Sequence, residues 1–125
     1  MGKPIPEDKL AAKSGSYIPE RGDIVWLMFN PQSGHEQSRH RPALVISPKS
    51  YNSKTGLALF CPITTKIKGY PFEVRIVAGD KINGAVLCDQ VKSLDWRARD
   101  ARFIAAAPGD IVAGVIGNIN LLINE

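Results

Sequence analysis

The sequence predicts a mainly β protein: a small twisted antiparallel barrel with one helix packed on it at the C-terminal end. Two patterns carry this prediction, because five to seven short runs of β-forming residues precede residue 106, and the apolar spacing then becomes helical. Size is the third observation, since 125 residues with 44% hydrophobic side chains suit one domain that buries a core without disulfides or metal. A sheet needs one covered face and a helix needs one apolar platform, so the two parts complete each other.

The strands are predicted from short apolar runs bounded by turn residues. These runs are residues 23–29, 43–46, 57–63, 72–77 and 84–88, with weaker ones at 91–94 and 102–105. Pro62 has no backbone N–H to donate, so the third run is expected at a sheet edge or with a bulge near its end.

The C-terminal segment is predicted to be an amphipathic helix. Pro108 and Asp110 are typical of a helix start, and apolar side chains then recur at helical spacing, at Ile111, Val112, Val115, Ile116, Ile119, Leu122 and Ile123. Gly114 and Gly117 lie inside this stretch. Each interior glycine costs roughly 1 kcal/mol relative to alanine, so the helix needs packing to persist.

Residues 1–16 mix Pro, Gly, Ser and Lys without periodicity, which predicts a mobile arm or a cloning remnant outside a domain of residues 17–125. No stretch has the ~20 apolar residues of a membrane span, and no apolar signal-peptide region precedes the domain. Cys61 and Cys88 stand singly, without CxxC spacing, and the chain has two histidines. We therefore expect a cytoplasmic protein with reduced thiols, no metal and no cofactor.

Basic residues gather in the middle of the chain. The net charge is +4, but six Lys and Arg residues and no acidic residue occur between Arg39 and Lys68. Such a block attracts a polyanion or only keeps a solvated face soluble, and charge alone does not decide between the two.

Residues 30–40 form a long polar loop between two predicted buried strands, and loops of that length are more often functional than merely connecting.

This loop and the strand after it contain residue types suited to RNA cleavage. Internal transfer needs a base near the 2′-hydroxyl, an acid near the leaving 5′-oxygen and cationic donors on the phosphate. Glu36 and Arg41 are of the right types, and His35 and His40 can act as acid or base. The alternative is a surface ion pair of Glu36 with Arg41, worth at most about 1 kcal/mol, beside solvated histidines.

Two further segments combine polar and aromatic residues with cations. Thr64 and Thr65 end the third run and are followed by Lys66 and Lys68, which suits phosphate contacts and equally suits a Thr-rich turn. Trp96 is followed by arginines at 97 and 99, a pattern typical of base stacking, although a core tryptophan is the commoner explanation.

Polar residues follow the apolar run at residues 84–88. If strand alternation continues through them, Asp89 and Val91 lie on one face and Gln90 and Lys92 on the other. One of these faces can hold a polar pair in a cleft.

The chain contains four separated blocks: GDIVWLMFNPQSGHEQSRHRPALVISP, YNSKTG, CPITTKIKGYPFEV and GAVLCDQVKSLDWRAR. In this order they strongly resemble the MazF/PemK/Kid family of toxin endoribonucleases, and the YPFEV and DWRAR segments are most similar to the MazF branch. The similarity runs from about Tyr17 to the C-terminus, and four ordered blocks are more specific than any single motif.

The resemblance implies an SH3-like barrel with a C-terminal helix, acting as the toxin of a type II toxin–antitoxin system. It implies a homodimer that holds single-stranded RNA in grooves at its interface. Cleavage would need no metal and would leave a 2′,3′-cyclic phosphate and a 5′-hydroxyl. The implied partner is an antitoxin whose acidic, disordered tail covers the basic groove, and DNA would be reached only through the toxin–antitoxin complex.

Site residues follow from the resemblance, position by position. Arg41 and Thr64 match the principal catalytic pair, and Glu36 and His35 match further active-site positions. The implied RNA-binding residues are Trp26, Phe29, Gln37, Asn52, Lys68, Asp89, Gln90 and Lys92. His35 follows the PemK/Kid form of the motif, but that branch also uses an arginine where this chain has Leu87. We therefore expect only a modest contribution from His35.

Two other functions stay open at this point. A catalytically silent RNA-binding barrel would explain the basic block without Glu36 or Thr64. A gyrase-inhibiting toxin of the CcdB kind shares the fold, but proteins of that kind resemble one another in a Trp-Gly-Ile ending. This chain ends Leu122-Ile123-Asn124-Glu125, which counts against the CcdB alternative.

Overall fold

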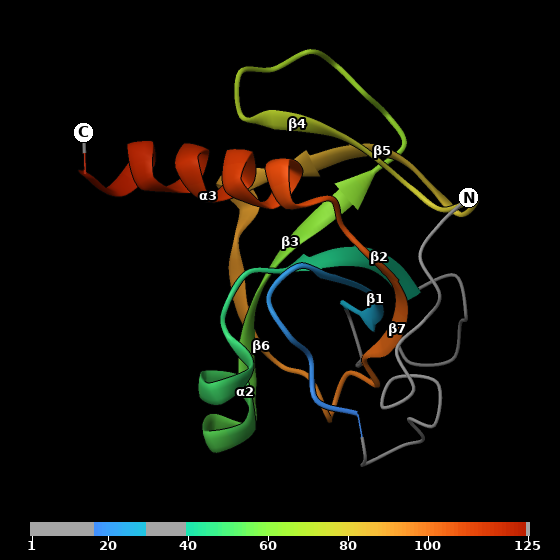
Figure 1. Cartoon of the computed structure of the whole chain (residues 1–125), viewed down its shortest axis with the longest axis vertical. Coiled ribbons are helices and arrows are strands. Elements are labelled where there is room, and N and C mark those ends of the chain that lie inside the picture. The colour runs from blue at the N-terminus through green and yellow to red at the C-terminus, as the bar shows by residue number, and fades with distance from the viewer. Residues whose placement is uncertain (1–16, 30–39, 125) are drawn as a thin grey trace.

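The computed structural model describes residues 17–29 and 40–124. Most of the described chain is β-strand, with short helices between strands and one long helix at the C-terminal end (Figure 1). The elements are β1 (Asp23–Met28), β2 (His40–Val45), α2 (Lys49–Thr55), β3 (Leu57–Thr64), β4 (Glu73–Ala78), β5 (Ile82–Leu87), the 3-10 helix η3 (Cys88–Gln90), β6 (Lys92–Asp95), β7 (Arg102–Ala106) and α3 (Gly109–Asn124). The predicted mainly β fold with a packed C-terminal helix is confirmed.

The seven strands form one antiparallel sheet that curls into a half-barrel (Figure 1). Its order is β4-β5-β3-β2-β1-β7, and β6 pairs with β3 outside this path. On one flank β3 changes partner, because residues 57–60 pair with β6 whereas Ile63 and Thr64 pair with β5. Of the two alternatives expected for Pro62, the sheet edge is wrong, since β3 has partners on both sides. Pro62 is tolerated because it falls where the pairing on this flank is interrupted.

Two apolar clusters occupy the two faces of the sheet. Neighbours such as Ile24 and Val25 enter different clusters, as the alternation of a strand requires. One cluster includes Leu44, Cys61 and Val86 and packs under α3, and the other includes Leu27, Val45, Phe60 and Trp96. Both faces of the central strands are therefore buried, which explains why these runs are nearly continuous in apolar residues.

Helix α3 confirms the predicted C-terminal helix and lies along one side of the sheet (Figure 1). Val115 is fully buried at its centre, and Ile111, Ile116 and Ile119 pack against the same cluster. Burial of this stripe offsets the cost of the interior glycines. In the described part of the chain, no helix is long and apolar enough to cross a membrane.

Helix α2 was not predicted. It is short, and the sequence shows no apolar periodicity over its seven residues. Its boundaries are nevertheless readable, because Pro48 precedes it in an extended conformation and Gly56 ends it at φ 74°, where its N–H donates to the Asn52 carbonyl. Helix α2 leads directly into β3.

Candidate functional site

The predicted site residues divide by whether the structure describes them. Glu36, His35 and Gln37 lie outside the described residues, and so does the N-terminal segment 1–16. The remaining predicted residues lie on β1 to β3, on α2, in the β3–β4 loop and near η3.

Strand register brings Arg41 and Thr64 together. In the β2–β3 pair, Ala43 is opposite Pro62 and Leu44 is opposite Cys61. Continuing this register by two positions sets Arg41 opposite Thr64, with both side chains on the same face of the sheet. Arg41 is exposed and Thr64 is half-buried. Two residues taken from separate sequence blocks thus reach the same end of two neighbouring strands.

Thr64 is held by contacts on both sides of its backbone. Its hydroxyl oxygen accepts a hydrogen bond of 3.0 Å from the Lys66 N–H, which fixes the first turn after β3. A Cβ atom at Gly84 would lie 2.2 Å from the Thr64 carbonyl oxygen. Only glycine allows β5 to approach β3 this closely, so Gly84 sets the position of Thr64.

The same cross-strand row continues beyond Thr64. Thr64 is opposite Ala85 of β5, and Ala85 is opposite Arg75 of β4. Arg75 is exposed and was not among the predicted site residues. A charged residue at an outward position of a strand is ordinary, so only the strand order reveals that Arg75 belongs to the row of Thr64.

The β3–β4 loop has a fixed backbone and carries Lys68. One carboxylate oxygen of Glu73 accepts from the N–H groups of Lys68, at 3.1 Å, and Gly69, at 2.8 Å. The Lys68 Nζ lies 5.9 Å from the centre of the Tyr70 ring, and both side chains are exposed. An ordered loop thus presents a cation and an aromatic ring to solvent just after Thr64.

The segment with Asp89, Gln90 and Lys92 does not continue the strand alternation of β5. Residues Cys88–Gln90 form the 3-10 helix η3, so the condition for setting Asp89 and Gln90 on opposite faces is not met. The helix turns Cys88 into the core and leaves Asp89 and Gln90 exposed together. Lys92 begins β6, opposite Phe60, and is exposed as well. All three polar side chains are therefore accessible.

Asn52 was predicted to contact RNA, and the structure does not support this. The residue is fully buried, and its amide nitrogen donates to the carbonyls of Pro19 at 2.8 Å and Ser47 at 3.0 Å. Its amide oxygen accepts from the Ser47 hydroxyl, and its own carbonyl accepts from the Trp96 indole at 3.0 Å. Asn52 therefore joins α2 to the rest of the fold and has no exposed surface for a ligand.

The aromatic residues of the predicted site differ in exposure. Trp26 is 37% exposed, whereas Phe29 packs partly buried against the cluster around Leu27. Trp96 is 3% exposed, so its interpretation as a core residue is confirmed. Of the three, Trp26 is the aromatic side chain most available to a base.

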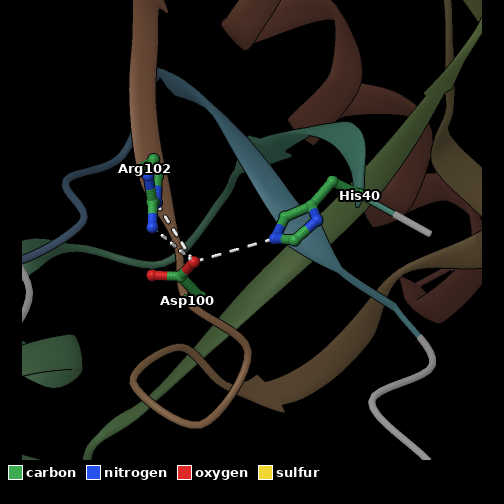
Figure 2. A network of polar contacts seen from close by, with 3 residues as sticks. All are labelled: His40, Asp100 and Arg102. Atoms are coloured by element: carbon green, nitrogen blue, oxygen red, sulfur yellow. Dashed lines mark hydrogen bonds and ion pairs between the residues drawn. The ribbon is translucent and has the colours of Figure 1, made fainter. Parts of the chain in front are cut away.

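Trp26 borders a hollow of about 320 Å³ that, among the described residues, is also lined by His40, Asp100 and Arg102. Figure 2 shows the Asp100 carboxylate between the other two side chains. One of its oxygens accepts from the Arg102 Nε at 3.0 Å and lies 3.7 Å from the His40 Nε2. The Asp100 carboxylate therefore neutralises Arg102.

The two cysteines are buried free thiols in the cluster under α3. Burial raises the pKa of Cys61 to about 12, and burial likewise raises the pKa of Cys88. Both stay protonated at neutral pH and are poor nucleophiles. Across residues 17–29 and 40–124, no three His, Cys, Asp or Glu side chains gather closely enough to hold a metal ion.

Comparison with known proteins identifies the family. The family described as "PemK-like, MazF-like toxin of type II toxin-antitoxin system" matches residues 20–123. The chain belongs to this family. The endoribonuclease toxin MazF of Escherichia coli strain K12 is 47% identical over 107 residues, which cover 86% of this chain and 96% of that protein.

Solved structures of MazF relatives agree with the fold. The crystal structure of MazF from Deinococcus radiodurans has a TM-score of 0.77 and 50% identity, covering 87% of this chain and 99% of that one. A MazE–MazF crystal structure from the same organism has a TM-score of 0.77 and 45% identity, covering 86% and 97%. The family and the fold predicted from the four sequence blocks are both confirmed.

Proposed function

We propose that this chain is a toxin endoribonuclease that cleaves single-stranded RNA by internal transfer, without a metal ion. The carrying observation is that Arg41 and Thr64 lie at the same end of the paired strands β2 and β3, where continuing the register sets them opposite each other, in a chain of the MazF-like toxin family. The relative from Escherichia coli at 47% identity is named an endoribonuclease toxin, which supports the same reaction class.

In the proposed reaction the RNA 2′-oxygen attacks the neighbouring phosphorus and the bond to the 5′-oxygen breaks. Glu36 takes the 2′-hydroxyl proton, and the leaving 5′-oxygen gains a proton from His35 or from water. The Arg41 guanidinium and the Thr64 hydroxyl stabilise the negative charge on the crowded phosphorus centre. The products are a 2′,3′-cyclic phosphate and a 5′-hydroxyl.

The exposed residues around this row form the proposed RNA-binding surface. Lys68 and Lys92 supply charge for backbone phosphates, and Asp89 and Gln90 present hydrogen-bonding groups to unpaired bases. Trp26 also supplies a flat face for stacking, but it is opposite Pro42 and so lies on the other face of the sheet from Arg41. The fixed β3–β4 loop supports this assignment, because an ordered backbone holds the Lys68 cation beside the reacting groups.

We also propose a homodimer and a cognate antitoxin with an acidic tail as partners. Exposed apolar side chains at the end of α3, Leu121, Leu122 and Ile123, supply area for contact with a second subunit. A MazF relative from Deinococcus radiodurans was crystallised with MazE, which supports an antitoxin partner here. DNA would be reached only through that complex, and the cytoplasm is the proposed location.

The deciding experiment is incubation of the protein with a long single-stranded RNA in excess EDTA, followed by mapping of the ends. We expect endonucleolytic cuts with 2′,3′-cyclic phosphate and 5′-hydroxyl ends. A 2′-O-methyl RNA of the same sequence is the matched control and should stay intact, because its 2′-oxygen cannot attack. Activity that appears only with Mg²⁺ or Mn²⁺ would overturn the metal-free reaction, and binding without any cutting would favour the silent RNA-binding barrel.

A further inference from the structure

Most arginines in the described residues are already engaged by the fold. Arg21 and Arg99 donate to backbone carbonyls, Arg102 is paired with Asp100, and Arg97 stacks on the Trp96 ring at 4.9 Å. The charges of Arg41 and Arg75 are different, because no carboxylate among the described residues pairs with either. An unpaired, exposed guanidinium is available to an anionic ligand.

These two arginines lie on one cross-strand row on either side of Thr64. Arg41 is opposite Thr64 by continuation of the β2–β3 register, and Ala85 separates Thr64 from Arg75. Strands are spaced about 4.8 Å apart, so the Arg75 backbone is about two spacings, or roughly 10 Å, from that of Thr64. The long arginine side chain can cover much of this distance.

Nothing bulky on this row separates Arg75 from Thr64. Ala85 is fully buried and its side chain is a single methyl group, so it adds little bulk to the row. Gly84 keeps β5 close to β3 at this position, which fixes the spacing of the row. The row therefore has one exposed cation, Arg41 or Arg75, on each side of the half-buried Thr64.

The Arg75 guanidinium is also oriented. Its Nη2 donates a hydrogen bond of 3.1 Å to the Asn83 Oδ1 on the adjacent strand β5. This contact uses one of the five N–H donors of arginine and leaves its charge intact, because Asn83 is neutral. The remaining donors suit a phosphate, whose oxygens match the planar fork of the guanidinium.

We propose that Arg75 is a second phosphate-binding residue of this site, which holds a backbone phosphate adjacent to the one bound by Arg41, with Asn83 as its positioning residue. The ligand class is the phosphodiester backbone of single-stranded RNA, so this inference rests on the proposed function. With Arg75 on one side and Arg41 on the other, the RNA backbone is stretched across Thr64.

The test compares Arg75→Ala, Arg75→Lys, Asn83→Ala and Lys81→Ala. Lys81→Ala is the matched control, because it removes one exposed positive charge from the β4–β5 turn, away from the row. Cleavage of a short RNA is measured as kcat/KM at several salt concentrations, together with binding of its 2′-O-methyl form. Thermal unfolding of each variant confirms that the fold is intact.

We expect Arg75→Ala to lower kcat/KM about tenfold at low salt and to reduce the log–log salt slope of binding by about 0.7, the value for one phosphate of a single strand. Arg75→Lys should keep the slope, because the charge remains, but lose several-fold in kcat/KM, because the fork is lost. Asn83→Ala should also keep the slope and lose a few-fold in kcat/KM. Lys81→Ala should match the wild type.

The inference is overturned if Arg75→Ala behaves like Lys81→Ala in both rate and salt slope. It is also overturned if Arg75→Ala binds RNA normally but loses affinity for the antitoxin, because Arg75 would then serve that protein. Failure of the proposed function looks different, since the wild type would then cut no RNA. In that case the salt dependence of 2′-O-methyl RNA binding, compared between the wild type and Arg75→Ala, still tests whether Arg75 contacts a phosphate.

Discussion

Two polar regions of this molecule differ in burial and in the pairing of their side chains. Around Asn52, every side-chain amide atom is engaged by the fold, and the residue is fully buried. Along the row of Arg41, Thr64 and Arg75, the guanidinium groups are exposed and unpaired by acids of the described chain. Asn52, Arg41 and Thr64 all lie in sequence blocks of one family pattern, so a motif does not tell the two regions apart. Burial and pairing are what separate a polar residue that holds the fold from one that meets a ligand.

This difference in burial and pairing predicts whether a substitution changes the stability of the fold or the activity. Removing a buried, fully paired group leaves its partners without hydrogen bonds, so the cost appears in the free energy of unfolding. Removing an exposed cation leaves the fold intact, so the cost appears in cleavage or binding.

The largest effect should come from Asn52→Ala. This substitution leaves the Pro19 and Ser47 carbonyls without their donor in the interior, and we expect a loss of about 3–4 kcal/mol in the free energy of unfolding. Urea unfolding measures it. Ser53→Ala on the exposed side of α2 is the control and should change stability by less than about 0.5 kcal/mol. An Asn52→Ala protein that is equally stable but defective in RNA binding would restore the original prediction for Asn52.

Arg41→Ala should show the opposite pattern. We expect its cleavage rate to fall roughly a hundredfold, because one preorganised donor to a developing charge is worth ~3 kcal/mol. Its urea unfolding curve should match the wild type. Arg97→Ala is the control, since that arginine is also exposed but stacks on Trp96, and its rate should stay within about twofold of the wild type. A rate loss below tenfold for Arg41→Ala would assign Arg41 to structure.

Gly84→Ala should lower both the stability and the cleavage rate. The added Cβ meets the Thr64 carbonyl at 2.2 Å, so β3 and β5 must separate, at a cost of about 2 kcal/mol in stability. Thr64 moves with its strand, so the rate of the folded protein should fall by at least tenfold in the same variant, as small misplacements in a site do. Gly114→Ala in α3 is the control, because its Cβ meets nothing within 4 Å. Normal cleavage by Gly84→Ala would show that Thr64 is not part of the reacting group.

Much of the fold could be predicted, because the spacing of apolar residues along the chain differs between strands and helices. The helix at residues 108–123 and the strands at 23–29 and 57–63 follow from side-chain spacing alone. Helix α2 could not be predicted this way, because tertiary hydrogen bonds to Asn52 hold it and no apolar stripe marks it. The 3-10 helix η3 could not be predicted either. The apolar residues before it look the same whether the strand continues or a turn follows.

The sequence predicts the residue types of the proposed site but not which strands bring them together. Arg41 and Thr64 follow from sequence blocks, but their meeting depends on a β2–β3 register that no local pattern specifies. The position of Arg75 in the row of Thr64 cannot be predicted without the strand order, which sets β4 beside β5 and β5 beside β3. Asn52 shows the reverse error, because sequence alone does not tell whether an amide points to solvent or into the core.

The smallest effect tests the buried side of β3 through its pH dependence. Cys61 lies three residues before Thr64 on the same strand, and burial raises the pKa of its thiol to about 12 from an ordinary value of 9.0. The folded state therefore favours the neutral thiol, so this contribution to stability is complete below pH 9 and is lost as the pH rises towards 12. Between about pH 8 and pH 10 the thiol should lower the free energy of unfolding by ~1 kcal/mol.

Urea unfolding of the wild type and of Cys61→Ala at both pH values isolates this effect, because all exposed groups titrate equally in the two proteins. Cys61→Ala is less stable at pH 8 because it leaves a small cavity, but it should lose about 1 kcal/mol less than the wild type on going to pH 10. Equal losses would mean that the interior beside the site admits water, and the contrast between a closed core and an open row on β3 would then be wrong.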